Sequence, residues 1–73
     1  MTDWRKAYVG LAKAGYTDEQ IAELAGVTRA VINGVRNGTW PYPHEPKHSG
    51  GQRILHYVDE AIRHGLLEED PLK

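Results

Sequence analysis

Residues 17–33, TDEQIAELAGVTRAVIN, decide how this chain of 73 residues folds. Thr17 and Gln20 have the spacing of a capping box, in which each side chain bonds the other residue's backbone N–H at a helix start. That helix should end at Gly26, because glycine readily adopts the left-handed backbone of a helix end. Thr28 then has the position and the hydroxyl needed to cap a second helix. The stretch therefore predicts two short helices joined by a tight turn.

Helical patterns on both sides of this stretch predict an all-α chain. Apolar residues recur at helical spacing over residues 3–15 and again over residues 52–64. Ser49 and Gln52 repeat the capping-box spacing more weakly, ahead of the last helix. Three prolines within residues 38–48 prevent a helix there, so this stretch is expected to be an extended connection. The expected fold is one small domain over residues 1–73 with about four helices, and its end is expected to fray from Asp70-Pro71.

Composition excludes several classes of protein. The sequence contains no cysteine, so disulfides and thiolate metal sites are excluded. It has no apolar run of membrane-spanning length and no segment typical of a signal peptide, so a cytoplasmic location without a membrane is expected. The net charge is −1, but it is unevenly distributed: residues 26–58 hold four Lys or Arg against one acidic residue, and residues 59–73 hold two against five. The basic part allows an electrostatic footprint on DNA, next to an acidic tail.

The two central helices and their turn form a helix-turn-helix motif. Ala22 is small enough for a close helix crossing, and Gly26 accepts the positive φ of the turn. Residues 17–37 resemble the motif of the lambda-repressor-like (Cro-type) DNA-binding family, and with the first helix the resemblance extends over residues 3–37. It implies a lambda-repressor-like domain that binds double-stranded DNA, commonly as a repressor of phages, prophages or antitoxin-type systems. The chain departs from the family in its proline-rich connection and in the single helix after it. It also has Asp18 where glutamine is common, and Asp18 is expected to act only as a helix-start charge.

The exposed side of residues 28–37 is polar and small, which suits a major groove about 12 Å wide. Arg29 can bond a guanine and Asn33 an adenine, while the methyl group of Ala30 can touch a thymine. Gly34 either allows a close approach to DNA or merely weakens the helix. The other candidates are placed for phosphates. The full predicted DNA-binding set is Thr28, Arg29, Ala30, Asn33, Gly34, Arg36, Asn37, Lys47 and Arg53.

The last helix is the expected place for self-association. It offers more apolar surface than one short domain needs, and a two-fold dimer would match a palindromic operator. The predicted dimer residues are Val58, Ile62, Leu66 and Leu67. The expected function is a Cro-like transcriptional repressor, phage or prophage in origin, that occludes a promoter without a small-molecule effector.

Two alternatives stay open. An excisionase-like or architectural recombination factor uses the same kind of fold on repeated sites. A protein-interaction module, such as a phage inhibitor, would instead engage a basic partner through the acidic C-terminal end. Catalysis, cofactors and metal are not expected: His44 and His48 are separated by Pro46, which prevents a shared helix face, and Ser49 has no evident histidine and carboxylate partners.

Overall fold

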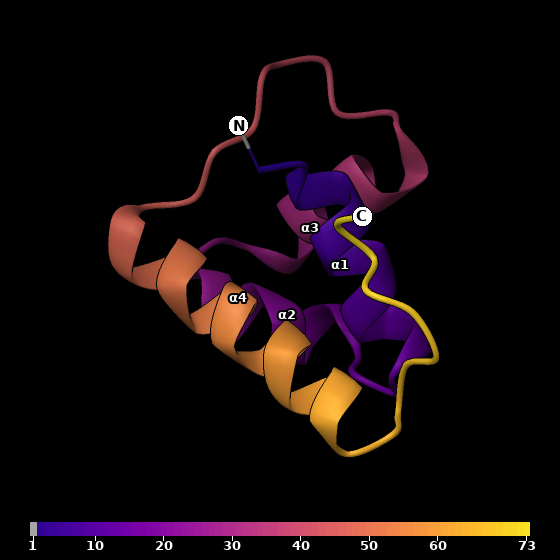
Figure 1. Cartoon of the computed structure of the whole chain (residues 1–73). Coiled ribbons are helices and arrows are strands. Elements are labelled where there is room, and N and C mark those ends of the chain that lie inside the picture. The colour runs from indigo at the N-terminus through magenta and orange to yellow at the C-terminus, as the bar shows by residue number, and fades with distance from the viewer. Residues whose placement is uncertain (1) are drawn as a thin grey trace.

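The computed structural model describes residues 2–73, which form four α-helices and no strand. Helix α1 spans Trp4–Lys13, α2 Asp18–Ala25, α3 Arg29–Asn37 and α4 His48–Arg63. Helices α1 and α2 pack against each other and against both α3 and α4, whereas the backbones of α3 and α4 do not approach each other within the described residues (Figure 1). The all-α class and the helix-turn-helix arrangement of α2 and α3 are confirmed. No helix in residues 2–73 has the length and apolar character needed to cross a lipid bilayer.

The starts of α2 and α3 form as the sequence predicts. Gln20 N donates to Thr17 Oγ1 at 3.1 Å, and Thr17 N donates to Gln20 Oε1 at 2.9 Å, which completes the capping box. Thr28 Oγ1 accepts from Val31 N at 3.4 Å at the start of α3. Gly26 lies at φ 73° and ends α2. Helices of eight or nine residues are rarely stable on their own. The caps of α2 and α3 therefore stabilise these helices together with packing against the core.

Helix α4 begins earlier than the sequence predicts. Its first residue is His48 instead of Gln52, and its start has no side-chain cap, so the predicted bonds between Ser49 and Gln52 do not form. The reason is the packing of two glycines that look like turn residues in the sequence. Gly50 lies against the carbonyl oxygen of Ala25 so closely that a Cβ would clash, and the ring of Trp4 covers Gly51. The glycines thus permit a close helix crossing, and they lie inside the helix.

One hydrophobic core joins all four helices. Its largest fully buried side chains come from every helix: Tyr8, Leu11, Ile21, Ile32 and Ile54. The small residues Ala7, Ala22 and Ala25 are buried in the same core. Because a chain of this length buries a limited area, each of these contacts carries a large share of the stability.

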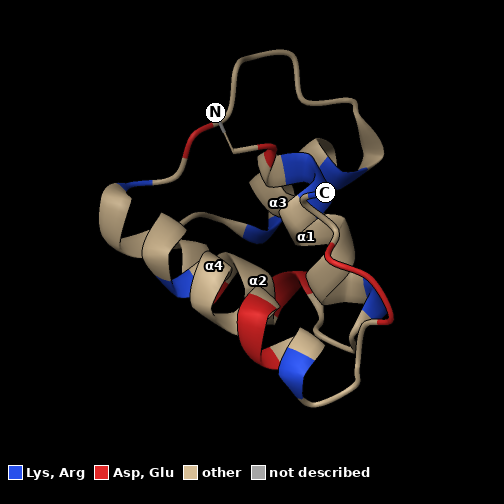
Figure 2. Cartoon of the chain, viewed as in Figure 1, with Lys and Arg blue, Asp and Glu red and all other residues tan. Residues whose placement is uncertain are grey.

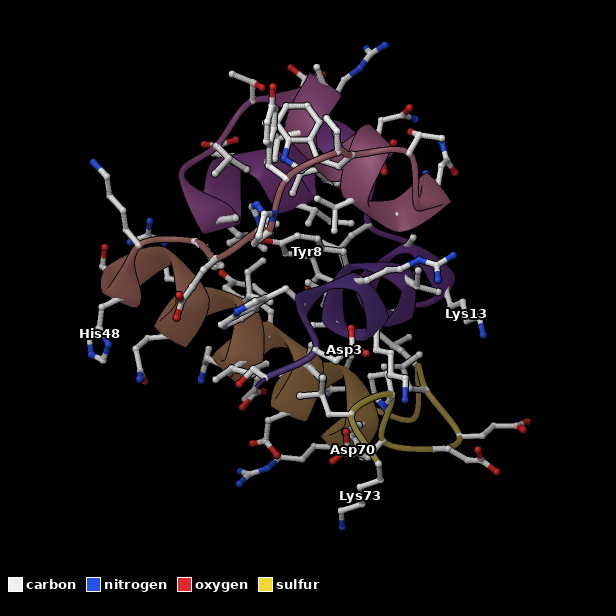
Figure 3. All side chains as sticks on the ribbon, turned by 90° about the horizontal axis from the view of Figure 1, so that it is seen from above. Asp3, Tyr8, Lys13, His48, Asp70 and Lys73 are labelled. Atoms are coloured by element: carbon white, nitrogen blue, oxygen red, sulfur yellow. The ribbon has the colours of Figure 1, made fainter. Side chains whose placement is uncertain are left out.

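The connection between α3 and α4 arches away from the helices (Figure 1), and Trp40 and His44 are among the residues that hold it against them. Trp40 packs on Gly34 of α3, and its backbone N–H donates to the carbonyl oxygen of Gly34 at 3.1 Å. Further along, His44 Nε2 lies 2.6 Å from the hydroxyl of Tyr8 in α1. Figure 3 shows Tyr8 in the interior, beneath this connection. The connection is therefore extended, as predicted, and it is part of the packed structure.

Burial keeps both partners of this second contact neutral. It raises the pKa of Tyr8 to about 12 and lowers the pKa of His44 below its ordinary value of 6.5. A neutral imidazole with an unprotonated Nε2 accepts the hydrogen bond from the Tyr8 hydroxyl. A protonated ring has no acceptor nitrogen, so acid reverses this bond, with Nε2–H donating to the Tyr8 oxygen, and places a positive charge in a partly buried site.

The domain should therefore lose stability in mild acid. The lowered pKa of His44 means that the unfolded chain binds this proton more readily, so the free energy of unfolding falls as the pH drops below 6.5. We expect the melting temperature to fall more between about pH 7.5 and about pH 5.5 in the wild type than in His44→Gln, whose side chain accepts the same bond without titrating. Equal decreases in the two proteins would show that His44 is not the responsible group.

The C-terminal segment returns along α1, and the expected fraying from Asp70-Pro71 is wrong (Figure 1). The ring of Pro71 packs on Gly10, where a Cβ would lie 2.6 Å from its Cγ atom. Leu72 packs against the core, and its backbone N–H donates to Asp70 Oδ1 at 2.9 Å. Gly10 therefore leaves space on α1 for the end of the chain.

Candidate nucleic-acid interface

The outer side of α3 brings together five of the predicted DNA-binding residues. Its inner side is buried through Ile32 and Val35. Its nine residues, RAVINGVRN, include no acidic side chain, and the cap Thr28 is also uncharged. The five predicted residues that the structure places on the exposed side are Thr28, Arg29, Ala30, Asn33 and Asn37.

Gly34 is not on this exposed side, which corrects the prediction that it faces DNA. It is buried, and a Cβ there would lie 2.9 Å from a ring atom of Trp40. The absence of a side chain makes room for the indole on α3. Neither sequence interpretation of Gly34 included this contact, because nothing in the local pattern shows that the chain turns back after Gly38.

Asp18 links the start of α2 to α3 through two side chains. Its Oδ1 accepts from Arg36 Nε at 2.7 Å, and its Oδ2 accepts from an Arg36 Nη at 3.0 Å. The same Oδ2 accepts from Asn33 Nδ2 at 3.3 Å. The side chains of Arg36 and Asp18 are only 29% and 17% exposed, so this is a partly buried, bidentate ion pair. The hydrogen bond from Arg36 holds the pKa of the Asp18 carboxyl below its ordinary value.

This contact changes the expected roles of two residues. Asp18 was expected to act only as a helix-start charge, and Arg36 as a free phosphate ligand. In the structure each side chain is the main partner of the other. Eighteen residues separate them, and only the crossing of α2 and α3 brings them together, so sequence spacing gave no signal for the pair.

Arg5 is a further cation beside α3 that the sequence analysis missed. Its Nε donates to the carbonyl oxygen of Arg36 at 3.1 Å, and its guanidinium lies beside Gly38, where α3 ends. A positive charge is favourable at this end of a helix, where carbonyl groups lack partners. The sequence offered one indication of this role, since Arg5 is a basic residue in the first turn of the first predicted helix and lies outside its apolar pattern.

Lys47 and Arg53 lie apart from the outer side of α3. Lys47 is exposed at the start of α4, a helix whose backbone does not approach that of α3 in the described residues. Arg53 is exposed beside the turn between α2 and α3, where its Nε donates to the carbonyl oxygen of Leu24 at 2.8 Å. Arg53 thus satisfies the end of α2, and it remains close to the helix-turn-helix motif.

Most of the predicted dimer residues pack against other parts of the same domain. Val58 is 3% exposed and belongs to the core, because this side of α4 packs against α1 and α2. Ile62 is partly buried against the same core, and Leu67 lines the groove between α1 and the C-terminal segment. Leu66, 53% exposed, is the predicted dimer residue that remains well exposed. The surface expectation for Val58 is therefore wrong.

The arrangement of α2 and α3 is the feature from which a function can be inferred. No protein-family model, curated protein or solved structure matches the chain. Charge is also unevenly distributed over the helices. Lys and Arg predominate on α3 and in the first turn of α1, whereas Asp and Glu predominate on α2 and the C-terminal segment (Figure 2). Residues 2–73 hold no group of three His, Asp or Glu side chains arranged for a metal ion.

Proposed function

We propose that this domain is a sequence-specific regulator of transcription that binds double-stranded DNA by inserting α3 into the major groove. The observation that carries the proposal is the outer side of α3, which is exposed, polar and free of carboxylates on a rigid helix-turn-helix. A short helix with small side chains fits the width of that groove. The resemblance of residues 17–37 to the lambda-repressor-like family supports the same function.

The proposed contacts divide into base reading and phosphate binding. Arg29 bonds a guanine through its guanidinium, and Asn33 bonds an adenine through its amide. The methyl group of Ala30 meets a thymine methyl. Thr28 and Asn37, at the two ends of α3, bind phosphates together with the backbone N–H groups at the helix start. Lys47 and Arg53 extend the phosphate contacts toward α4.

The proposed mechanism is repression by occupying a promoter, as a Cro-like regulator of a phage or prophage does in the cytoplasm. Occupying a promoter needs no contact other than that with DNA, so the single helical domain that the described residues form is enough for it. A homodimer would present two copies of α3 to a palindromic site. With Val58 inside the core, the dimer contact would centre on Leu66.

Selection from a random pool of duplex DNA at about 100 mM salt tests this function, because phosphate contacts weaken steeply with salt. Recovery of a palindrome with half-sites about 10 bp apart would support a dimeric regulator. A direct repeat would favour the recombination factor. No enrichment, together with no binding at low salt, would reject DNA binding and favour the protein-interaction module.

Truncation of either base-reading side chain should weaken binding to the selected duplex. We expect Arg29→Ala and Asn33→Ala each to cost about 1–3 kcal/mol, or roughly 5-fold to 150-fold in Kd, and to relax preference at one base pair. Fluorescence anisotropy titrations of the labelled duplex measure both effects. Arg63→Ala is the matched control, since Arg63 is an exposed cation at the far end of α4. Unchanged affinity and selectivity in both variants would contradict the role of α3.

A further inference from the structure

The amide of Asn33 has a fixed orientation in the structure. Its Nδ2 donates to Asp18 Oδ2 at 3.3 Å, and its Oδ1 accepts from Asn37 Nδ2 at 3.2 Å. A carboxylate only accepts hydrogen bonds, so the nitrogen of the Asn33 amide must be the atom that faces Asp18. Rotation of the amide by 180° would place two acceptor oxygens against each other.

Both contacts leave Asn33 the capacity to bind a base. The amide nitrogen carries two N–H groups and the amide oxygen has two lone pairs, and each contact within the protein uses one of them. One N–H and one lone pair of this exposed side chain therefore remain without a partner in the described residues. In the major groove, adenine offers the matching pair, an acceptor at N7 beside a donor at N6, whereas guanine offers two acceptors.

We propose that Asp18 is a positioning residue for base recognition: its carboxylate fixes the amide of Asn33 so that this side chain presents a preset donor and acceptor to adenine. This inference rests on the proposed function of α3. Arg36 supports the arrangement by holding the other edge of the Asp18 carboxylate, at 2.7 Å and 3.0 Å, and it is a counter-charge instead of a phosphate ligand.

The electrostatic environment is consistent with this role. The Arg36 guanidinium keeps the pKa of Asp18 low, so the carboxylate stays ionised and accepting at neutral pH. The pairing also neutralises a carboxylate that would otherwise repel the phosphates of an approaching duplex. An amide held in place before binding loses less conformational entropy when it meets the base.

Two variants that break the same ion pair separate positioning from stability. Asp18→Ala removes the partner of Asn33, whereas Arg36→Ala leaves the contact between Asp18 and Asn33 intact. Each variant is titrated against the selected duplex and against duplexes that differ from it at one base pair. This base pair is the one at which the Asn33→Ala protein loses its preference. Thermal unfolding of every variant records the structural effect of the lost ion pair.

We expect Asp18→Ala to lower the preference for adenine at that base pair about tenfold, within the discrimination that one bidentate contact supplies. Arg36→Ala should keep most of the preference while losing a similar amount of stability. In an Asn33→Ala background, Asp18→Ala should change the preference no further. If Asp18→Ala does not fold, Asp18→Asn keeps the shape but leaves one acceptor oxygen, for which Asn33 must compete with the charged Arg36, and the preference should again fall.

Three results would overturn the proposal. Retained preference in Asp18→Ala would show that Asn33 needs no positioning, while the proposed function would stand. Equal loss of preference in Asp18→Ala and Arg36→Ala would assign the effect to the ion pair and the placement of α3. A wild-type protein that binds all duplexes equally, or none, would reject the proposed function and this inference together.

Discussion

Replacement of Gly50 by alanine should destabilise the domain more than any other single-methyl addition. The Cβ would meet the carbonyl oxygen of Ala25 at the crossing of α4 and α2. The Cβ is bonded directly to the backbone of α4 and the oxygen belongs to the backbone of α2, so neither can move aside as the end of a flexible side chain would, and the helices must separate. We expect a loss of about 3 kcal/mol or more, at the upper end of overpacking effects, measured by thermal unfolding followed by circular dichroism.

Ser49→Ala is the control for this substitution. Ser49 is the preceding residue of α4, it is exposed and it makes no capping bond. Its replacement should change stability by at most about 0.5 kcal/mol. If Gly50→Ala unfolds at the same temperature as Ser49→Ala, α4 does not lie as close to α2 at Gly50 as described above.

Truncation of Tyr8 to alanine should destabilise the domain by a similar amount. Here the cause is a cavity in the core, whereas Gly50→Ala introduces an atom for which there is no space. Tyr8 is the largest of the fully buried side chains, and its ring joins α1 to the connection through His44. We expect Tyr8→Ala to cost about 3–5 kcal/mol in urea unfolding, as for other buried aromatic residues. For a domain of this size, such a loss leaves a large unfolded fraction at 25 °C.

Tyr8→Phe separates the two contributions of this side chain. It keeps the ring in the core and removes only the hydroxyl that bonds His44 Nε2 at 2.6 Å. The expected cost is about 1 kcal/mol, the usual net contribution of one hydrogen bond. A loss in Tyr8→Phe as large as that in Tyr8→Ala would place the stabilisation in the hydrogen bond instead of the ring.

Local signals in the sequence were sufficient for α2 and α3. The bonds between Thr17 and Gln20, the cap at Thr28 and the turn at Gly26 each depend on residues within a few positions of one another. Such features are set by backbone geometry over one helical turn. The exposed side of α3 followed from the same periodicity, with Gly34 as the exception.

Features that depend on distant residues could not be predicted in this way. A glycine in a sequence indicates either a turn or a close contact, and the pattern around Gly50 and Gly34 does not distinguish the two. The packing of Pro71 on Gly10 joins residues at opposite ends of the chain. The ion pair of Asp18 and Arg36 depends on the crossing of two helices. In each case the partner is known only once the helices are assembled.

The outer residues of α3 have a consequence for how this protein can change over generations. Arg29 and Ala30 are exposed and take no part in the core, so their replacement leaves the fold unaffected. Asn33 is different, because its neighbour Asp18 also holds Arg36. For the DNA binding proposed above, new preferences can therefore evolve by single replacements of Arg29 or Ala30. A replacement of Asn33 must instead be accompanied by a change of Asp18 on another helix.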